Sequence, residues 1–169
     1  RGGVNGDSND RFCLDGQRLI AAPGSTYGAN GTEYRTEIES FSRIYSYGWC
    51  GTGPCRFEVT DKHGNLAVFG ETNAVAKLDD GLTPRAYALQ KIKDPNGNYL
   101  VANYTLSLGQ LYPLEIVYTK HDSAPGLKMR RVGFEYESRT DNEFAYVAGT
   151  KVQTNSRLSR IKTYLGTST

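Results

Sequence analysis

Apolar residues recur at every second position in several short segments of the chain. Three such series lie in its C-terminal half: Leu114, Ile116 and Tyr118; Val132, Phe134 and Tyr136; and Phe144, Tyr146 and Ala148. Side chains two residues apart in a strand point to the same face, so each series predicts a strand with one apolar face. Turn-forming pairs separate the segments: Asp15-Gly16, Asn30-Gly31, Gly64-Asn65, Asp80-Gly81 and Asn96-Gly97. This rhythm is typical of a many-stranded antiparallel protein.

The first hairpin is expected over residues 12–20. Residues 12–14 and 18–20 form its strands, and Asp15 and Gly16 form the turn. A tight hairpin turn needs positive φ at both central residues, and Asp and Gly both tolerate positive φ.

Two later hairpins share the turn sequence Asp-x-x-Gly-Asn. The turn residues are Asp61, Gly64 and Asn65 in one hairpin and Asp94, Gly97 and Asn98 in the other. Aspartate can accept hydrogen bonds from backbone amides two residues further on, and glycine supplies positive φ. We therefore assign these residues, with Asp15 and Gly16, a structural role and no part in chemistry.

The segment from Tyr34 to Tyr47 is more ambiguous. Tyr34, Ile38, Phe41 and Tyr45 fall at helical spacing, but the Thr, Ser and aromatic content favours strand. We predict a strand broken by a bulge near Ser40 and, further on, a last strand over residues 158–165. No stretch predicts a helix of three turns. The predicted fold is all-β, an antiparallel multi-hairpin sheet or sandwich.

Length and charge narrow the functional classes. The 169 residues suffice for one domain, or for one piece of a larger one. A net charge of +2, from 20 basic and 18 acidic residues spread along the chain, argues against nucleic-acid binding. No apolar run approaches the roughly 20 residues of a membrane helix, so membrane insertion by this segment is not expected.

The start of the chain predicts a fragment of a longer polypeptide, because it begins with Arg1 and the single Met is Met129. A mature protein that has lost its leader is the alternative. We divide the chain into a polar lead-in over residues 1–10, one β-rich unit over 11–165 and a tail over 166–169. Residues 125–126 are expected to form an extended connection.

The cysteines leave two interpretations open. Cys50 and Cys55 flank a flexible Gly-Thr-Gly-Pro loop and could close a small disulfide, which leaves Cys13 unpaired. Alternatively, all three remain thiols. A structural zinc site needs four ligands, and no pair of Cys or His has zinc-finger spacing, so neither a metal nor a cofactor is expected.

Glu135 and Glu137 are the strongest enzymatic candidates. In a strand their carboxylates share one face about 7 Å apart. Paired carboxylates serve glycosidases, and a Glu-x-Glu pair serves ADP-ribosyltransferases, which would also recruit Arg35 and the Ser25-Thr26 pair. However, the apolar series at 132, 134 and 136 places both glutamates on the solvent side. We expect solvated carboxylates partnered by Arg130, Arg131 and Arg139, and hence no catalytic residues.

The 12 tyrosines raise a different possibility, because their flat amphipathic rings could form an adhesin-like surface for carbohydrate or peptide. Tyrosine is equally expected in half-buried strands, and that interpretation is preferred.

Several blocks resemble the N-terminal region of Salmonella-type virulence plasmid B proteins, which is shared with the B components of insecticidal toxin complexes. They are residues 11–19 (RFCLDGQRL), 31–41 (GTEYRTEIESF), 57–61 (FEVTD), 91–98 (KIKDPNGN), 132–139 (VGFEYESR) and 157–164 (RLSRIKTY), in the same order as in the family. The resemblance covers about residues 11–165. The Asp-x-x-Gly-Asn hairpins are less specific, because related Rhs and YD-repeat proteins carry similar turns.

This resemblance implies a secreted bacterial protein that forms part of a β-rich shell. In the family, B components and their Rhs-type partners enclose a toxic polypeptide, and ADP-ribosylation belongs to a separate C-terminal domain that has no match here. The expected partners are the remainder of the parent chain and an Rhs-type toxin protein. The expected function is structural and non-catalytic. The alternatives are a secreted enzyme that uses Glu135 and Glu137, and a tyrosine-rich binding module.

Overall fold

The computed structural model describes residues 5–7, 9–71, 73–125 and 128–166. Within this part of the chain there are thirteen β-strands and no helix, which confirms the predicted all-β class. The strands are β1 (Cys13–Leu14), β2 (Gln17–Ala21), β3 (Glu33–Thr36), β4 (Arg43–Tyr47), β5 (Arg56–Thr60), β6 (Leu66–Gly70), β7 (Val75–Lys77), β8 (Pro84–Tyr87), β9 (Leu89–Lys93), β10 (Asn98–Ser107), β11 (Gln110–His121), β12 (Arg130–Val147) and β13 (Thr150–Leu165).

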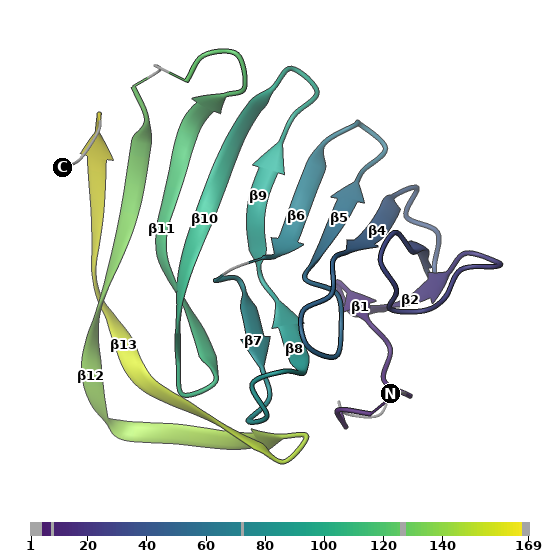
Figure 1. Cartoon of the computed structure of the whole chain (residues 1–169). Helices are drawn as coiled ribbons and strands as arrows, with labels where there is room; N and C mark the ends of the chain where they lie inside the picture. The colour runs from purple at the N-terminus through teal and green to yellow at the C-terminus, as the bar shows by residue number, and fades with distance from the viewer. Residues whose placement is uncertain (1–4, 8, 72, 126–127, 167–169) are drawn as a thin grey trace.

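Eleven of the described strands form one open antiparallel sheet in the order β1-β2-β3-β4-β5-β6-β9-β10-β11-β12-β13. Nearly every strand therefore pairs with its neighbour in sequence (Figure 1). The exception is the β7–β8 hairpin, which forms a separate two-stranded sheet between β6 and β9 in the chain. Of the two predicted arrangements, sheet and sandwich, the structure has the single sheet.

One face of this sheet is apolar across successive strands. Ile44 of β4 pairs with Val59 of β5, Val59 with Ala67 of β6, and Ala67 with Ile92 of β9, so all four side chains lie on that face. The buried core lies over the first half of the face and consists of Leu19, Tyr34, Ile44 and Phe57. Complete burial of a side chain as large as Ile44 contributes about 1.5–3 kcal/mol.

The opposite face is polar and carries ion pairs within and between strands. They include Arg35–Glu33, Arg56–Glu58, Arg131–Glu115 and Arg157–Glu137. These pairs are partly or fully exposed, so each contributes only about 0–1 kcal/mol. The sheet therefore owes its stability mainly to the apolar face.

The predicted single strand over residues 34–47 is wrong in one respect, because the segment forms two paired strands. Tyr34 of β3 lies opposite Ile44 of β4, and residues 37–42 form the connection. In this connection Ile38 and Phe41 are exposed, and Phe41 has a φ of 57°. The segment reverses direction at residues 37–42, where we expected a bulge. The apolar residues at helical spacing are therefore two strand residues, Tyr34 and Tyr45, and two residues of the connection.

The two Asp-x-x-Gly-Asn turns have matching geometry. The amide N–H of Asn65 donates to Asp61 Oδ1 at 2.9 Å, and that of Asn98 donates to Asp94 Oδ1 at 2.8 Å. The side-chain amides of both asparagines bond the second carboxylate oxygen. These bonds, the side-chain amide bond first, hold the pKa of both aspartates below the usual range. Each carboxylate thus fastens one hairpin turn.

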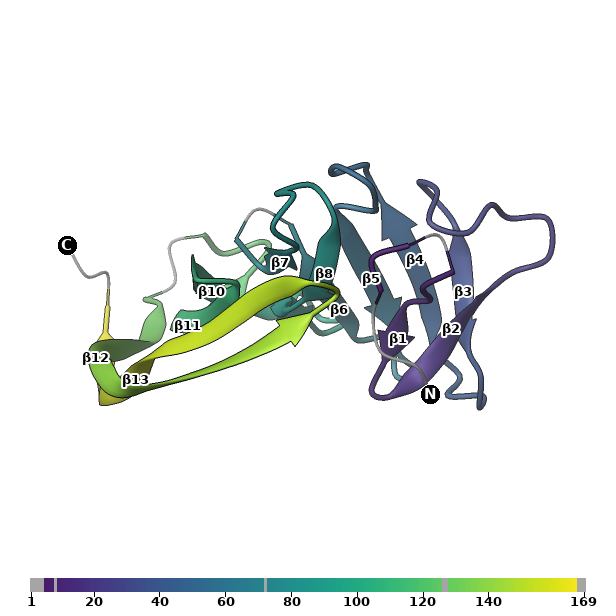
Figure 2. The same cartoon turned by 90° about the horizontal axis from the view of Figure 1, so that it is seen from below.

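The C-terminal hairpin is longer than the sequence predicted. β12 continues from residue 130 to 147 through an irregularity between Ser138 and Glu143, and β13 starts at residue 150. Ala148 belongs to the turn and not to the strand, since it and Gly149 have φ of 48° and 79°. Both figures show the hairpin bending and crossing beneath the rest of the sheet (Figures 1 and 2).

Contacts distant in sequence hold the far end of this hairpin. The amide N–H of Asp79 donates to Thr150 Oγ1 at 2.9 Å, and the amide N–H of Asn155 donates to the Tyr112 hydroxyl at 3.2 Å. At the bend, Arg139 forms two hydrogen bonds to the carboxylate of Asp141. The hairpin end therefore lies against the loop that follows β7.

Parts of the predicted lead-in, connection and tail fall outside the described residues, namely 1–4, 8, 126 and 167–169. Within the described part of the lead-in, the Asp10 carboxylate accepts backbone N–H bonds from Asn5 and Gly6. Asp15 and Gly16, in the first hairpin turn, have φ of 49° and 76°.

The shared turns generate the first prediction. Gly64 and Gly97 have φ of 84° and 90°, where an L side chain costs roughly 1–2 kcal/mol. Gly64→Ala and Gly97→Ala should each lower the free energy of unfolding by about that amount in urea titrations. Gly133→Ala is the control, because Gly133 lies in β12 without positive φ. Equal effects at all three positions would contradict the role given to these turns.

Candidate functional site

A cleft of about 780 Å³ opens on the apolar face of the sheet. Its floor includes core residues of the sheet, such as Leu19, Ile44 and Phe57. Its walls come from the segment around Phe12, from the loop between β4 and β5, and from β8. We call it the aromatic cleft, because its lining includes the aromatic residues Phe12, Tyr27, Trp49, Phe57, Phe69 and Tyr87.

The aromatic rings of the cleft pack against one another. Phe12 stacks on Tyr27 with ring centroids 5.3 Å apart and meets Phe57 edge-on at 4.8 Å. Phe57 in turn meets Tyr87 edge-on at 4.9 Å. Such pairs stabilise by about 0.5–1.5 kcal/mol beyond the area that they bury. The cluster joins segments that lie far apart in the sequence.

The two tyrosines of the cluster are fixed by hydrogen bonds. The Tyr27 hydroxyl accepts from the amide of Phe12 at 2.7 Å and donates to Leu19 O at 3.3 Å. The Tyr87 hydroxyl donates to Pro54 O at 2.9 Å. Burial raises the pKa of Tyr27 to about 12, and burial also raises the pKa of Tyr87. Both hydroxyls stay protonated and keep these bonds over the physiological pH range.

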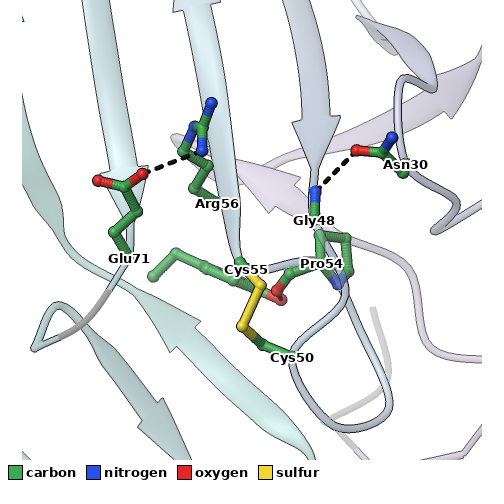
Figure 3. Close-up of a disulfide and its surroundings, with 8 residues drawn as sticks. Asn30, Gly48, Cys50, Pro54, Cys55, Arg56 and Glu71 are labelled. Atoms are coloured by element: carbon green, nitrogen blue, oxygen red, sulfur yellow. Dashed lines mark hydrogen bonds and ion pairs between the residues drawn. A yellow bond between two sulfur atoms is a disulfide. The ribbon is translucent and has the colours of Figure 1, made fainter.

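A disulfide between Cys50 and Cys55 closes the loop that forms one wall (Figure 3). On either side of the loop, the amide of Gly48 donates to Asn30 Oδ1 at 2.8 Å, and Arg56 pairs with Glu71. Cys13 is a free, exposed thiol.

The same loop is fitted closely to the turn between β7 and β8. Thr52 Oγ1 donates to Thr83 Oγ1 at 3.0 Å, and the Thr52 amide contacts Leu82 O. At Gly51 a β-carbon would lie 2.1 Å from Leu82 O, so this position requires glycine. The disulfide and the loop contacts therefore hold the wall in one position.

Glu135 and Glu137 lie together on the polar face, as expected from their spacing, but their predicted partners are wrong. Glu135 pairs with Lys162 and Arg160, and Glu137 pairs with Arg157, all from the adjacent β13. The hydrogen bond from Lys162 and the two cations lower the pKa of Glu135. This opposes the raised pKa that a carboxyl needs to act as a general acid.

The predicted arginine partners are engaged elsewhere. Arg131 pairs with Glu115, and Arg139 pairs with Asp141 at the hairpin bend. The difference arises because cross-strand neighbours, which depend on the register of β12 with β13, replace the neighbours in sequence.

The remaining candidates show no convergent chemistry. The described residues contain no group of three or more His, Cys, Asp or Glu side chains placed to hold a metal ion. The tyrosines are divided between the core and the polar face, where the Tyr47 and Tyr99 rings have cations over them. No helix in the described ranges has the length and apolar character needed to cross a membrane.

Sequence reasoning missed the aromatic cleft. The signal available in the sequence was Trp49, the single tryptophan, directly before the Cys50–Cys55 loop. Phe12 and Tyr87 could not be connected to it, because 75 positions of sequence separate them.

No protein-family model and no curated protein matches the chain. Solved structures do share its fold. The N-terminal domain of the effector protein SpvB from Salmonella typhimurium matches with a TM-score of 0.78 and 14% identity, over 97% of this chain and 72% of that chain. A Photorhabdus luminescens Tc holotoxin pore matches at 0.76 and 18%, over 96% and 10%. The TcdB2–TccC3–Cdc42 complex matches at 0.75 and 15%, over 96% and 11%.

These matches show that the chain shares its open, antiparallel β-sheet fold with the matched effector and Tc toxin structures. The particular fold is that of the SpvB N-terminal domain and of a segment that makes up about a tenth of the matched Tc toxin chains. The resemblance inferred from the sequence blocks is confirmed at the level of fold.

The disulfide gives the second prediction. Closing a loop of six residues reduces the entropy of the unfolded chain by an amount equivalent to about 2 kcal/mol at 25 °C. The double variant Cys50→Ser/Cys55→Ser should therefore unfold with about 2 kcal/mol less free energy in urea titrations. Cys13→Ser is the control and should leave stability unchanged. A double variant as stable as the oxidised wild type would contradict the structural role of the bridge.

Proposed function

We propose that this chain is a non-catalytic structural segment of a β-rich shell, of the kind built by a secreted toxin-complex B component with its Rhs-type partner to enclose or present a toxic polypeptide. The observation that carries the proposal is the uncovered part of the sheet. The core cluster and the β7–β8 hairpin cover the first half of the apolar face, whereas several apolar side chains of β11 and β13 are exposed in the other half, which we call the open half.

The open half exposes several large apolar side chains. Leu158, Ile161 and Leu165 of β13 are 48%, 56% and 74% exposed, and Tyr118 of β11 is also exposed. Contiguous apolar patches on a protein surface mark contacts with other chains or segments. The proposed occupant is a neighbouring β segment of a longer parent chain or the Rhs-type partner.

The edge of the sheet supports the same assignment. β13 pairs with β12 alone among the described strands. Near its start the amide of Gln153 donates to Leu108 O and that of Asn155 donates to the Tyr112 hydroxyl, whereas no strand partner is described for the outer side of its later part. Proteins that act alone usually protect such edges, because unpaired backbone groups at an edge can pair with strands of other chains. A shell segment instead keeps the edge open for the next strand. The fold likeness to a segment of much longer Tc toxin chains agrees with this role.

Self-association provides the first test of the proposal. Light scattering should show that the isolated chain associates as its concentration rises. The reason is that the edge strand β13 and the exposed apolar side chains of one copy can contact those of a second copy. Leu158→Lys/Ile161→Lys/Leu165→Lys should remain monomeric. Phe144→Lys/Tyr146→Lys is the matched control, since both residues are exposed on the bent end of the hairpin. A wild type that stays monomeric at all concentrations, with protected outer amides of β13 in hydrogen exchange, would refute the proposal.

The absence of catalysis is tested separately. Wild-type chain should show no NAD hydrolysis and no glycosidase turnover above buffer, since the cations around Glu135 hold its carboxyl ionised. Glu135→Gln/Glu137→Gln should keep the wild-type fold by circular dichroism. Turnover that disappears in this variant, and persists in Glu115→Gln on the same polar face, would establish the enzyme alternative instead.

A further inference from the structure

We propose that the aromatic cleft is a binding site for a neutral, apolar small molecule that contains an aromatic ring. This inference is independent of the shell function. Its volume of about 780 Å³ lies within the range of roughly 300–1,000 Å³ that small-molecule sites occupy.

The chemical class follows from the hydrogen bonds of the walls. The hydroxyl-bearing side chains lining the cleft are Tyr27, Thr52, Thr83 and Tyr87, and each donates its hydroxyl proton to another protein atom. A sugar or other polyhydroxylated ligand needs several free partners and would lose its bonds to water without replacement. These four side chains therefore offer a ligand no free hydroxyl proton, and most of what the lining offers is apolar contact.

Three charged side chains at the cleft, Asp10, Arg11 and Arg85, contact other protein groups. The Arg85 guanidinium donates to Gly109 O at 2.7 Å, and its Nε is buried without a hydrogen-bond partner among the described residues. Asp10 accepts the amides of Asn5 and Gly6, and the Arg11 guanidinium lies over the Tyr27 ring at 4.8 Å. An ionised ligand would have to lose its hydration and compete with these contacts for a charged partner, so the cleft favours a neutral ligand.

The cleft is formed in advance of binding. The disulfide, the Thr52–Thr83 bond and the Tyr87–Pro54 bond fix two of its walls, and the Phe12–Tyr27 stack fixes another. A site that is already ordered loses little conformational entropy when a ligand enters. Trp49, which is 63% exposed, stands at the mouth, and its ring becomes covered by an occupant.

Trp49 also provides the assay, because it is the single tryptophan of the chain. N-phenyl-1-naphthylamine, a neutral aromatic probe, absorbs where tryptophan emits. Saturable binding should raise the probe's emission and quench that of Trp49 by energy transfer, with one probe bound per chain. Trp49→Phe should keep the rise in probe emission on direct excitation and lose the transfer.

Two variants locate the site. Leu14→Lys places a charge in the wall, and Thr52→Arg places one at the exposed mouth, so each should weaken probe binding at least tenfold. Leu165→Lys, on the open apolar half of the sheet, should bind the probe as wild type does. Circular dichroism and melting curves identify any variant that fails to fold. If Leu14→Lys does not fold, probe binding by Thr52→Arg tests the location of the site.

Removal of the disulfide provides a further test of the site. Cys50→Ser/Cys55→Ser should weaken probe binding while Cys13→Ser does not, because only the former loosens the wall. Probe emission that rises without quenching of Trp49, or binding abolished by Leu165→Lys and unchanged by both cleft variants, would place the apolar site elsewhere and overturn the proposal.

Discussion

The strict alternation of side chains along antiparallel strands is the constraint on which this structure depends. It separates the residues of one sheet into a face of ion pairs and a face of apolar side chains. Only burial of the apolar face contributes much free energy to folding. Burial of Tyr34, Ile44 and Phe57 stabilises the first half of the sheet. In the second half the same alternation leaves Ile161 and Leu165 exposed. One rule thus explains both the core and the surface that remains open.

Features determined by local sequence were predictable. The Asp-Gly and Asp-x-x-Gly-Asn turns lie within single hairpins. Asp15 and Gly16 have positive φ, and the aspartate and asparagine of each Asp-x-x-Gly-Asn turn bond one another as their chemistry predicts. The segment over residues 34–47 was harder, because the exposed Ile38 and Phe41 imitate core positions. The local sequence does not distinguish apolar residues of a connection from apolar residues of a strand.

Features determined by register or by distant contacts could not be predicted. The ion pairs of Glu135 depend on which residues of β13 lie opposite it, and a shift of one position would exchange them. The aromatic cleft depends on Phe12, Trp49 and Tyr87 meeting across three separate segments. Periodicity assigns a residue to a face, whereas only the assembled sheet decides which residues meet on that face.

The order of strands has a consequence for how the chain folds. Almost every strand pairs with the one before it in the chain, so most strand pairings join neighbours in sequence. Hairpins can form in the order in which a ribosome delivers them, each using the previous strand as its template. The hydrogen bond between Asp79 and Thr150 spans 71 positions, so the bent end of the last hairpin can close on the β7 loop only when synthesis of the sheet is nearly complete. The sheet can thus be assembled from one side to the other, with its newest strand as the growing edge at every step except the one where the β7–β8 hairpin intervenes.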